Sequence, residues 1–273
     1  MKLKIDEGIR KDETGHYVFD KEFDFDKDII KLCTNTSGTK QIGNVIIYYG
    51  FEFNNKASSK EQKEFRDALK HKITDDDVFY GEEARRFVQD GIYNMDEMKS
   101  LNDFGVVIST ASTYGEKTLT GLMCQICWDE MPDRIPCCNL RLLKKFCKDV
   151  TFDEKKAKEA LMKTLKYADE EDANEAVENL KKQFNKAIKD GGLFKMKIYQ
   201  PVAGRIGFMD FLKFETPAHQ ELYRTFKEGT EVLICEDFIT SGSTVNEIIR
   251  FLNTINPNNK ISVFVLINQM RNY

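Results

Sequence analysis

One segment near the carboxyl end constrains the fold more than any other part of the chain. Residues 232–235 (VLIC) are apolar and predict a short buried strand, and residues 245–252 (VNEIIRFL) carry apolar side chains at helical spacing. After a turn at residues 256–259 (NPNN), residues 261–267 predict a second strand. A strand, a helix and a further strand in this order form a βαβ unit, so the sequence predicts an α/β domain with parallel strands.

The junction between the first strand and the helix carries a distinctive set of polar residues. Glu236 and Asp237 follow the strand, and residues 240–244 (TSGST) precede the helix. A turn of this kind at a helix start exposes backbone N–H groups to an anion, and Gly242 lets the backbone approach it closely. The two acids would repel a phosphate but suit sugar hydroxyls or a hydrated Mg²⁺. The combination indicates a site for a ribose 5-phosphate; the alternative is an ordinary turn capped by Ser243 or Thr244.

This segment resembles the phosphoribosyl pyrophosphate (PRPP) signature of the type I phosphoribosyltransferases, which has an apolar strand, two acids, two mostly apolar residues and a Thr/Ser/Gly turn. The resemblance implies that Glu236 and Asp237 are the catalytic acids and bind the ribose 2′- and 3′-hydroxyls. It also implies a 5′-phosphate site made by Thr240, Ser241, Gly242, Ser243 and Thr244. One departure is informative: the 6-oxopurine branch has an aspartate just before the turn, where this chain has Thr240. A hypoxanthine or guanine acceptor is therefore not expected.

Composition is consistent with a cytoplasmic enzyme. The 273 residues include 20 Phe and 10 Tyr, enough for a real core, and a net charge of −4 gives no overall polycation, so no nucleic-acid partner is expected. No apolar run approaches membrane-spanning length, the first residues lack a signal-peptide core, and seven Cys indicate reduced thiols.

Apolar periodicity and turn signals predict the remaining elements, apart from the segment above. They are a strand at 44–50, a helix from the Ser58–Glu61 capping box to about Lys70, a helix at 82–89, a strand at 104–109, a helix at 117–128, a strand at 139–143, two helices within 151–190 of which the first starts at a capping box at Thr151–Glu154, a strand at 194–199 and a helix at 217–226. We therefore expect a mostly parallel sheet flanked by helices. The resemblance implies two domains: an accessory hood at residues 1–103, and a phosphoribosyltransferase-like core at residues 104–273 with a helical insertion at about 151–190.

The resemblance also points to residues for pyrophosphate. They are Ser109, Thr110, Ala111, Ser112 and Thr113 in the turn after the 104–109 strand, then Lys144 and Lys145, and Arg205. Small and hydroxyl residues would let backbone amides face an anion, and an Arg can clamp one. The alternative for the turn is a generic loop, and the alternative for the two lysines is a solvated strand end. Arg205 could instead pair with Glu215.

The implied function is Mg²⁺-dependent transfer of the 5-phosphoribosyl group of PRPP to a nitrogenous base in nucleotide metabolism, with pyrophosphate released. The alternative is a non-catalytic protein that senses PRPP or a nucleotide. A PRPP-making diphosphokinase would need an ATP site and a duplicated domain, and no repeat is visible. The hood would choose the base, and the helices of residues 151–190 could form a lid or a homodimer contact.

The cysteines, the histidines and a lysine-rich segment each raise another possible function. Cys124, Cys127, Cys137, Cys138 and Cys147 could assemble a zinc site, but the spacing matches no standard pattern and buried apolar thiols account better for them, so no metal ligands are expected from the protein. The three histidines have no paired nucleophile. Residues 141–200 hold 15 basic and 11 acidic residues, but they alternate in sign and lack the interleaved aromatics of a nucleic-acid surface.

Overall fold

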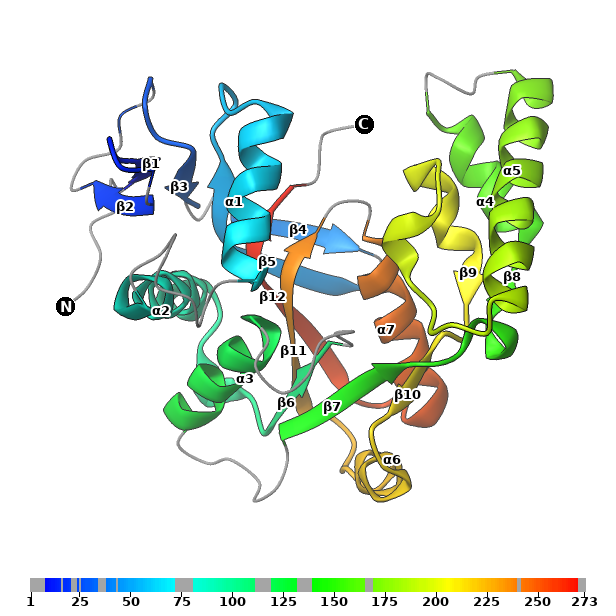
Figure 1. The fold of residues 1–273 in the computed structure, drawn as a ribbon. Coiled ribbons are helices and arrows are strands. Elements are labelled where there is room, and N and C mark those ends of the chain that lie inside the picture. The colour runs from blue at the N-terminus through cyan, green and yellow to red at the C-terminus, as the bar shows by residue number, and fades with distance from the viewer. Residues whose placement is uncertain are drawn as a thin grey trace.

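Five parallel strands form the centre of the molecule (Figure 1). The computed structural model describes residues 8–15, 17–20, 24, 26–33, 38–42, 44–71, 81–110, 119–131, 139–164, 169–239 and 242–269. Side by side, the central strands are β7 (Asn139–Lys144), β6 (Val106–Ser109), β11 (Glu231–Ile239), β12 (Lys260–Asn268) and β5 (Val45–Phe53). Helices flank this sheet, so the predicted α/β class with a mostly parallel sheet is confirmed.

Antiparallel strands extend the sheet at both edges. On one side β10 (Leu212–Phe214) pairs with β7. On the other side β3 (Ile30–Leu32), β1 (Gly8–Lys11) and β2 (Tyr17–Asp20) follow β5, which also pairs with β4 (Thr39–Ile42). The region before residue 104 therefore contributes β5 to the central sheet. Its predicted role as a separate hood, and the boundary at residue 103, stay predictions.

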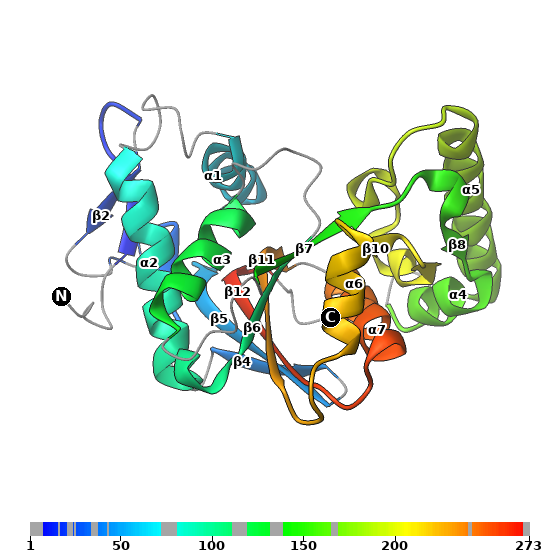
Figure 2. The ribbon, with the colours of Figure 1, turned by 90° about the horizontal axis from the view of Figure 1, so that it is seen from below.

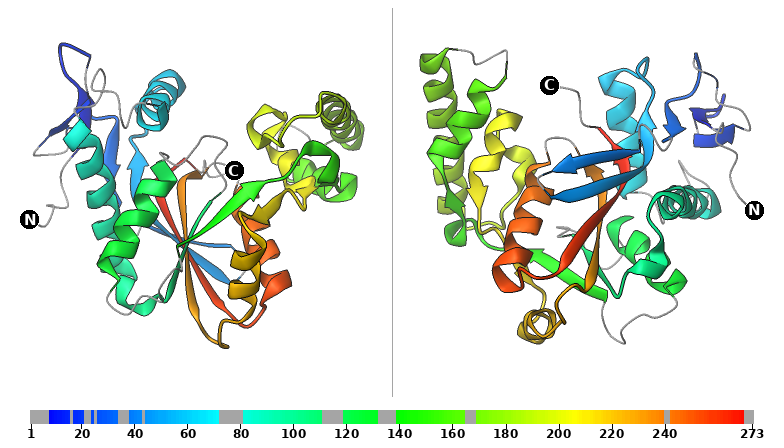
Figure 3. Two further views of the ribbon diagram at one scale, coloured as in Figure 1. Left: turned by 60° about the horizontal axis from the view of Figure 1, so that its bottom comes forward. Right: turned by 180° about the vertical axis from the view of Figure 1, so that it is seen from behind.

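Helices cover both faces of the sheet (Figures 2 and 3). α6 (Pro217–Arg224) and α7 (Ser243–Ile255) lie on one face, and α2 (Gly81–Met98) and α3 (Leu119–Glu130) on the other. Successive residues of β11 point to opposite sides: Ile234 packs in the cluster with α7, and Leu233 packs in the cluster with α2 and α3. This two-sided burial explains why residues 232–235 are continuously apolar.

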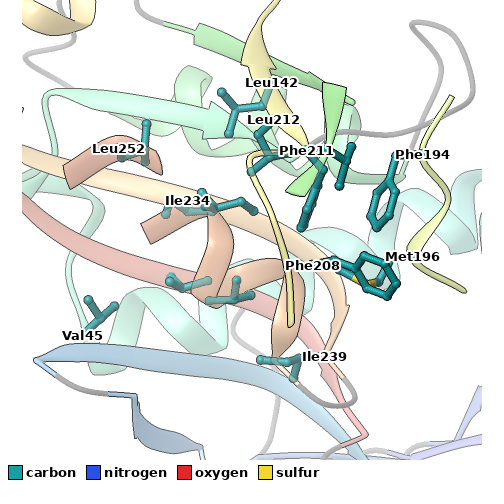
Figure 4. Packing of buried hydrophobic residues seen from close by; sticks show 14 of the residues in the cluster. Val45, Leu142, Phe194, Met196, Phe208, Phe211, Leu212, Ile234, Ile239 and Leu252 are labelled. Atoms are coloured by element: carbon teal, nitrogen blue, oxygen red, sulfur yellow. The ribbon is translucent and has the colours of Figure 1, made fainter. Parts of the chain in front are cut away.

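The predicted helical insertion is a pair of helices, α4 (Glu154–Met162) and α5 (Glu170–Lys189). They pack on the 3₁₀ helix η5 (Val202–Gly207). The contact is close at Gly204, because a Cβ added there would lie only 2.4 Å from Leu180 Cδ1 of α5. Their apolar side chains join the core cluster of the sheet through Phe194, Phe208 and Phe211 (Figure 4). The insertion therefore shares one hydrophobic core with the sheet.

The helix α1 (Ser59–His71) begins at the capping box that the sequence predicts. The Glu61 N–H donates to Ser58 Oγ at 3.2 Å, and the Ser58 N–H donates to Glu61 Oε2 at 2.8 Å. The Ser58 hydroxyl also donates to Glu61 Oε2 at 2.6 Å, and the bonds that this carboxylate accepts from the hydroxyl and the N–H of Ser58 hold the pKa of Glu61 below its ordinary value. α1 and the insertion lie on opposite sides of the carboxyl ends of the central strands (Figure 3).

Three local predictions are wrong. α2 continues to Met98 because Ile92 and Met95 extend its buried stripe past residue 89. Residues 194–199 form no strand: Met196–Ile198 is a 3₁₀ helix (η4), which buries Tyr199 as well as Met196. The cap of α4 is Asp153 and not the predicted Thr151. The Asp153 side chain accepts from the N–H of Lys156 at 3.0 Å, whereas Thr151 belongs to the short strand β8 (Thr151–Phe152), which pairs with β9 (Phe208–Met209).

Among the described helices, none is both long and apolar enough to cross a membrane.

Candidate functional site

The two predicted acids lie inside β11, near its carboxyl end. The strand does not stop at Cys235, as the sequence suggested, but continues to Ile239, because Phe238 and Ile239 are buried and pair with Ile267 and Asn268 of β12. Glu236 and Asp237 are half-buried, and Oδ1 of Asp237 accepts from the N–H of Phe238 at 2.8 Å. Both carboxylates are thus carried by the rigid sheet rather than by a loop.

The turn after β11 leads directly into α7. Gly242 caps this helix with φ of 72° and ψ of 0°, a left-handed conformation that favours glycine, and its carbonyl accepts from the N–H of Asn246 at 2.8 Å. A glycine cap has no side chain to occupy the amides of the first helical turn, so this end of α7 is suited to an external anion. Ser243 is buried and Thr244 half-buried, whereas Thr240 and Ser241 lie outside the described residues.

The predicted pyrophosphate turn begins beside the acids. In the pairing of β6 with β11, Ser109 lies opposite Cys235, and the N–H of Thr110 donates to the Cys235 carbonyl at 3.4 Å. The Ser109 hydroxyl donates to the Leu140 carbonyl of β7 at 3.4 Å, and both Ser109 and Thr110 are buried. The backbone after Ser109 therefore starts next to Glu236. The remaining predicted residues of this turn, Ala111, Ser112 and Thr113, lie outside the described residues.

The predicted lysines lie at the end of the next strand. Lys144 is the last residue of β7 and pairs with Leu212 of β10, and the N–H of Lys145 donates to the Phe211 carbonyl at 2.8 Å. Since β7 runs parallel to β6, both lysines are at the same edge of the sheet as Ser109. Three separate parts of the chain thus bring Glu236 and Gly242, Ser109, and Lys144 to one edge of the sheet.

Arg205 has a different environment from the other candidates. It is buried within η5, where Nε donates to the Tyr199 carbonyl at 2.8 Å and Nη2 donates to the Lys197 carbonyl at 3.0 Å. Burial lowers its pKa. The alternative pairing with Glu215 is wrong, because Glu215 lies 3.5 Å from the guanidinium of Arg141. These contacts give Arg205 a structural role, and its contact with pyrophosphate stays a prediction.

The thiols next to the site are buried on the face of β11 that packs against α3, opposite the face that packs against α7. Cys235 Sγ lies 3.9 Å from Cys127 Sγ of α3, and Cys124 is buried beside them. Burial raises the pKa of all three thiols. Within the described part of the chain, no three His, Cys, Asp or Glu side chains form a metal-binding group; Cys137 and Cys138 of the zinc alternative lie outside that part.

One contact at this edge was missed by the sequence analysis. Nη1 of Arg66, on α1, donates to Gln269 Oε1 at 2.9 Å, and the Gln269 N–H donates to the carbonyl of Ile239, the last residue of β11, at 2.9 Å. α1 is thereby connected to the strand end that precedes the 240–244 turn. No local pattern could have revealed it, because Arg66 and Gln269 are 203 residues apart.

Comparison with known proteins points to the same segment. Residues 215–273 match the family model of the phosphoribosyl transferase domain. The match includes α6, β11, the turn, α7 and β12, and it begins after Ser109, Lys144 and Arg205. No curated protein matches the chain. The match and the α/β sheet together are consistent with the type I phosphoribosyltransferase fold.

Proposed function

We propose that this chain, which has a phosphoribosyl transferase domain match over residues 215–273, binds PRPP and transfers its 5-phosphoribosyl group to a nitrogenous base. The observation that carries the proposal is the unit of β11, turn and α7. It has two carboxylates at the end of a buried strand and, five residues after Asp237, a helix capped by a left-handed glycine. Acids for a diol at the end of the strand and amides for a phosphate at the start of the next helix match the two ends of a ribose 5-phosphate.

The proposed reaction forms a bond between a nitrogen of the acceptor and C1 of the ribose, while the bond from C1 to the pyrophosphate oxygen breaks. Positive charge grows on the sugar and negative charge on the leaving group. Glu236 and Asp237 would accept hydrogen bonds from the ribose hydroxyls, and their negative charge favours the cationic sugar. Because both acids are held by the sheet, the ribose would be fixed relative to the phosphate turn.

The leaving pyrophosphate would lie over the end of β6. Ser109 and Thr110 start the turn there, and Lys144 ends the neighbouring strand, so amides and a cation would face the departing charge. Carboxylates supply the hard oxygen donors that Mg²⁺ prefers, and two half-buried acids suit an ion held mostly by substrate oxygens and water. When bound through Glu236 or Asp237, Mg²⁺ would neutralise part of the pyrophosphate charge.

Acceptor choice is assigned in this proposal to α1 and the end of β12. α1 lies over the carboxyl ends of β5 and β12 (Figure 1), and Arg66 and Gln269 connect it to β11. A guanidinium offers only donors, and Gln269 Oε1 is already engaged by Arg66. The pair would therefore favour a base that presents oxygen or ring-nitrogen acceptors to it.

The test mixes the purified full chain with PRPP, Mg²⁺ and a panel of purine and pyrimidine bases and measures released pyrophosphate. Base-dependent release, abolished when Mg²⁺ is chelated, is the expected result. PRPP binding by calorimetry without release from any base would favour the alternative of a PRPP sensor. The absence of PRPP binding would refute the proposed site itself.

A further inference from the structure

A second surface with binding character lies where the sheet meets the insertion. Phe146 and Leu193 form an antiparallel bridge and remain 47% and 42% exposed, whereas the next residue in each segment, Cys147 and Phe194, is buried. Phe146, Lys148 and Gly191 line a shallow hollow of about 200 Å³ beside this bridge. None of these residues belongs to the candidate phosphoribosyl site.

The backbone that carries the exposed ring of Phe146 is hydrogen-bonded on both sides. The Cys147 N–H donates to the Gly192 carbonyl at 3.0 Å, the Phe194 N–H to the Lys145 carbonyl at 2.9 Å, and the Asp149 N–H to the Phe146 carbonyl at 3.0 Å. The backbone of Phe146 is therefore fixed before any ligand arrives, which lowers the entropy cost of binding.

Gly191 contributes no side chain to the hollow that it lines. It has φ of 68°, and a Cβ placed on it would meet no heavy atom within 4 Å. The face of the hollow that Gly191 lines therefore carries no side chain, and a flat group could lie against it. The hollow is smaller than a typical small-molecule site, so it would enclose only part of a ligand.

The charges around the hollow favour an anion. Lys148 lines it and Lys195 follows the bridge by two residues; both are exposed, and neither forms an ion pair with a described residue. Exposed Asp149 and Asp190 on its flanks interrupt any longer basic track. An extended polyanion would run past both acids, so the charges favour a single phosphate over a long chain of phosphates.

We propose that this hollow binds a mononucleotide, whose base stacks on Phe146 and whose phosphate pairs with Lys148. An exposed aromatic ring beside a lysine is the arrangement that proteins use to hold a base and its phosphate. The sequence analysis found no interleaved aromatic in this lysine-rich region. The fold supplies one by turning Phe146 outward between Lys145 and Lys148.

The experiment titrates AMP and UMP into the full chain by isothermal calorimetry, with matched variants. Phe146→Leu keeps an apolar side chain but removes the aromatic face, and it should weaken binding roughly tenfold or more, whereas Phe146→Trp should retain it. Lys148→Gln should weaken binding about threefold to tenfold and reduce its dependence on salt. Ile198→Ala and Lys155→Gln change an equally exposed apolar residue and an exposed lysine elsewhere, and should leave affinity unchanged.

Because every substituted side chain is exposed, the variants should fold, and thermal unfolding checks this. Nucleotide binding at the phosphoribosyl site would not respond to Phe146→Leu, so the two sites are distinguishable. Equal affinity of Phe146→Leu and the native chain would overturn the proposal. So would affinity that rises with oligonucleotide length, which indicates a single-stranded nucleic-acid surface, or a Phe146-dependent dimer that binds no nucleotide.

Discussion

The backbone N–H of Asp210 donates to Oε1 of Glu247 at 2.6 Å and so connects the segment between β9 and β10 to α7. Asp210 adopts a positive φ of 61°, which directs its amide at the helix. Arg250, one turn further along α7, donates from Nε to Glu247 Oε2 at 2.7 Å and from Nη2 to Asp210 Oδ1. The helix whose start forms the candidate phosphate turn is thus anchored to the segment between β9 and β10 by three charged residues.

Removal of Arg250 should destabilise the fold measurably. Glu247 is almost fully buried, and Arg250→Ala leaves its carboxylate without its cationic partner. We expect a loss of about 2–4 kcal/mol in the free energy of unfolding, measured by urea denaturation. Arg224→Ala is the matched control, because its ion pair with Glu221 is exposed and should contribute less than about 0.5 kcal/mol. Equal losses in the two variants would contradict this account.

The same cluster predicts a loss of stability in acid. Partial burial by itself would raise the pKa of Asp210, but hydrogen bonds from Thr151 and Arg250 outweigh it and lower the pKa below its ordinary value. A depressed pKa in the folded state stabilises the fold above the unfolded-state pKa, and this contribution is lost as pH falls through the folded-state pKa. The free energy of unfolding should therefore decline below about pH 4, and less steeply in Asp210→Asn. If the free energy of unfolding falls equally steeply with pH in the native chain and in Asp210→Asn, Asp210 does not contribute to the loss of stability in acid.

A close backbone contact between β5 and α2 should tolerate no side chain. A Cβ on Gly50 would lie 2.8 Å from both the Cα and the carbonyl oxygen of Gly91. Because both atoms belong to the backbone, Gly50→Ala must push the helix away from the strand, at an expected cost of about 1–3 kcal/mol. Gly192→Ala, where the added Cβ meets nothing within 4 Å, should be nearly neutral in the same thermal unfolding measurement.

The thiols beside the candidate site should be inert in the folded protein. Cys124, Cys127 and Cys235 are buried, and burial raises the pKa of each. The thiolate is the reactive form, so iodoacetamide at pH 8 should modify these three residues only after denaturation, as peptide mapping by mass spectrometry would reveal. Rapid labelling of Cys235 in the native protein would show that β11 is less well covered than the structure indicates.

The assigned acids should affect PRPP far more than stability. Asp237→Asn and Glu236→Gln preserve side-chain size, and the two residues are half-buried at a strand end. Each should weaken PRPP binding roughly tenfold or more, because a charged acceptor for the ribose hydroxyls is lost. Thermal unfolding without ligand should change little. Undiminished PRPP affinity in the double variant would refute the role of these acids.

Local patterns account for the parts of the fold that the sequence predicted well. The strand, turn and helix from residue 231 to residue 255 depend on neighbouring residues: apolar β-formers, a glycine that can take positive φ, and apolar side chains three or four apart. The capping box of α1 is local as well. The strand predicted at residues 194–199 is wrong although the apolar and polar residues do alternate there. Burial of Tyr199 against Phe194 favours a compact 3₁₀ turn instead.

Contacts between distant residues decided how these elements are assembled. By itself the sequence determined that an apolar strand leads through two acids and a glycine turn into a helix, since each step involves residues adjacent in the chain. Only the tertiary structure placed β5 beside β12, connected Arg66 to Gln269, and turned Arg205 toward backbone carbonyls. Those outcomes depend on which buried surfaces meet across many residues, and local periodicity carries no information about such partners.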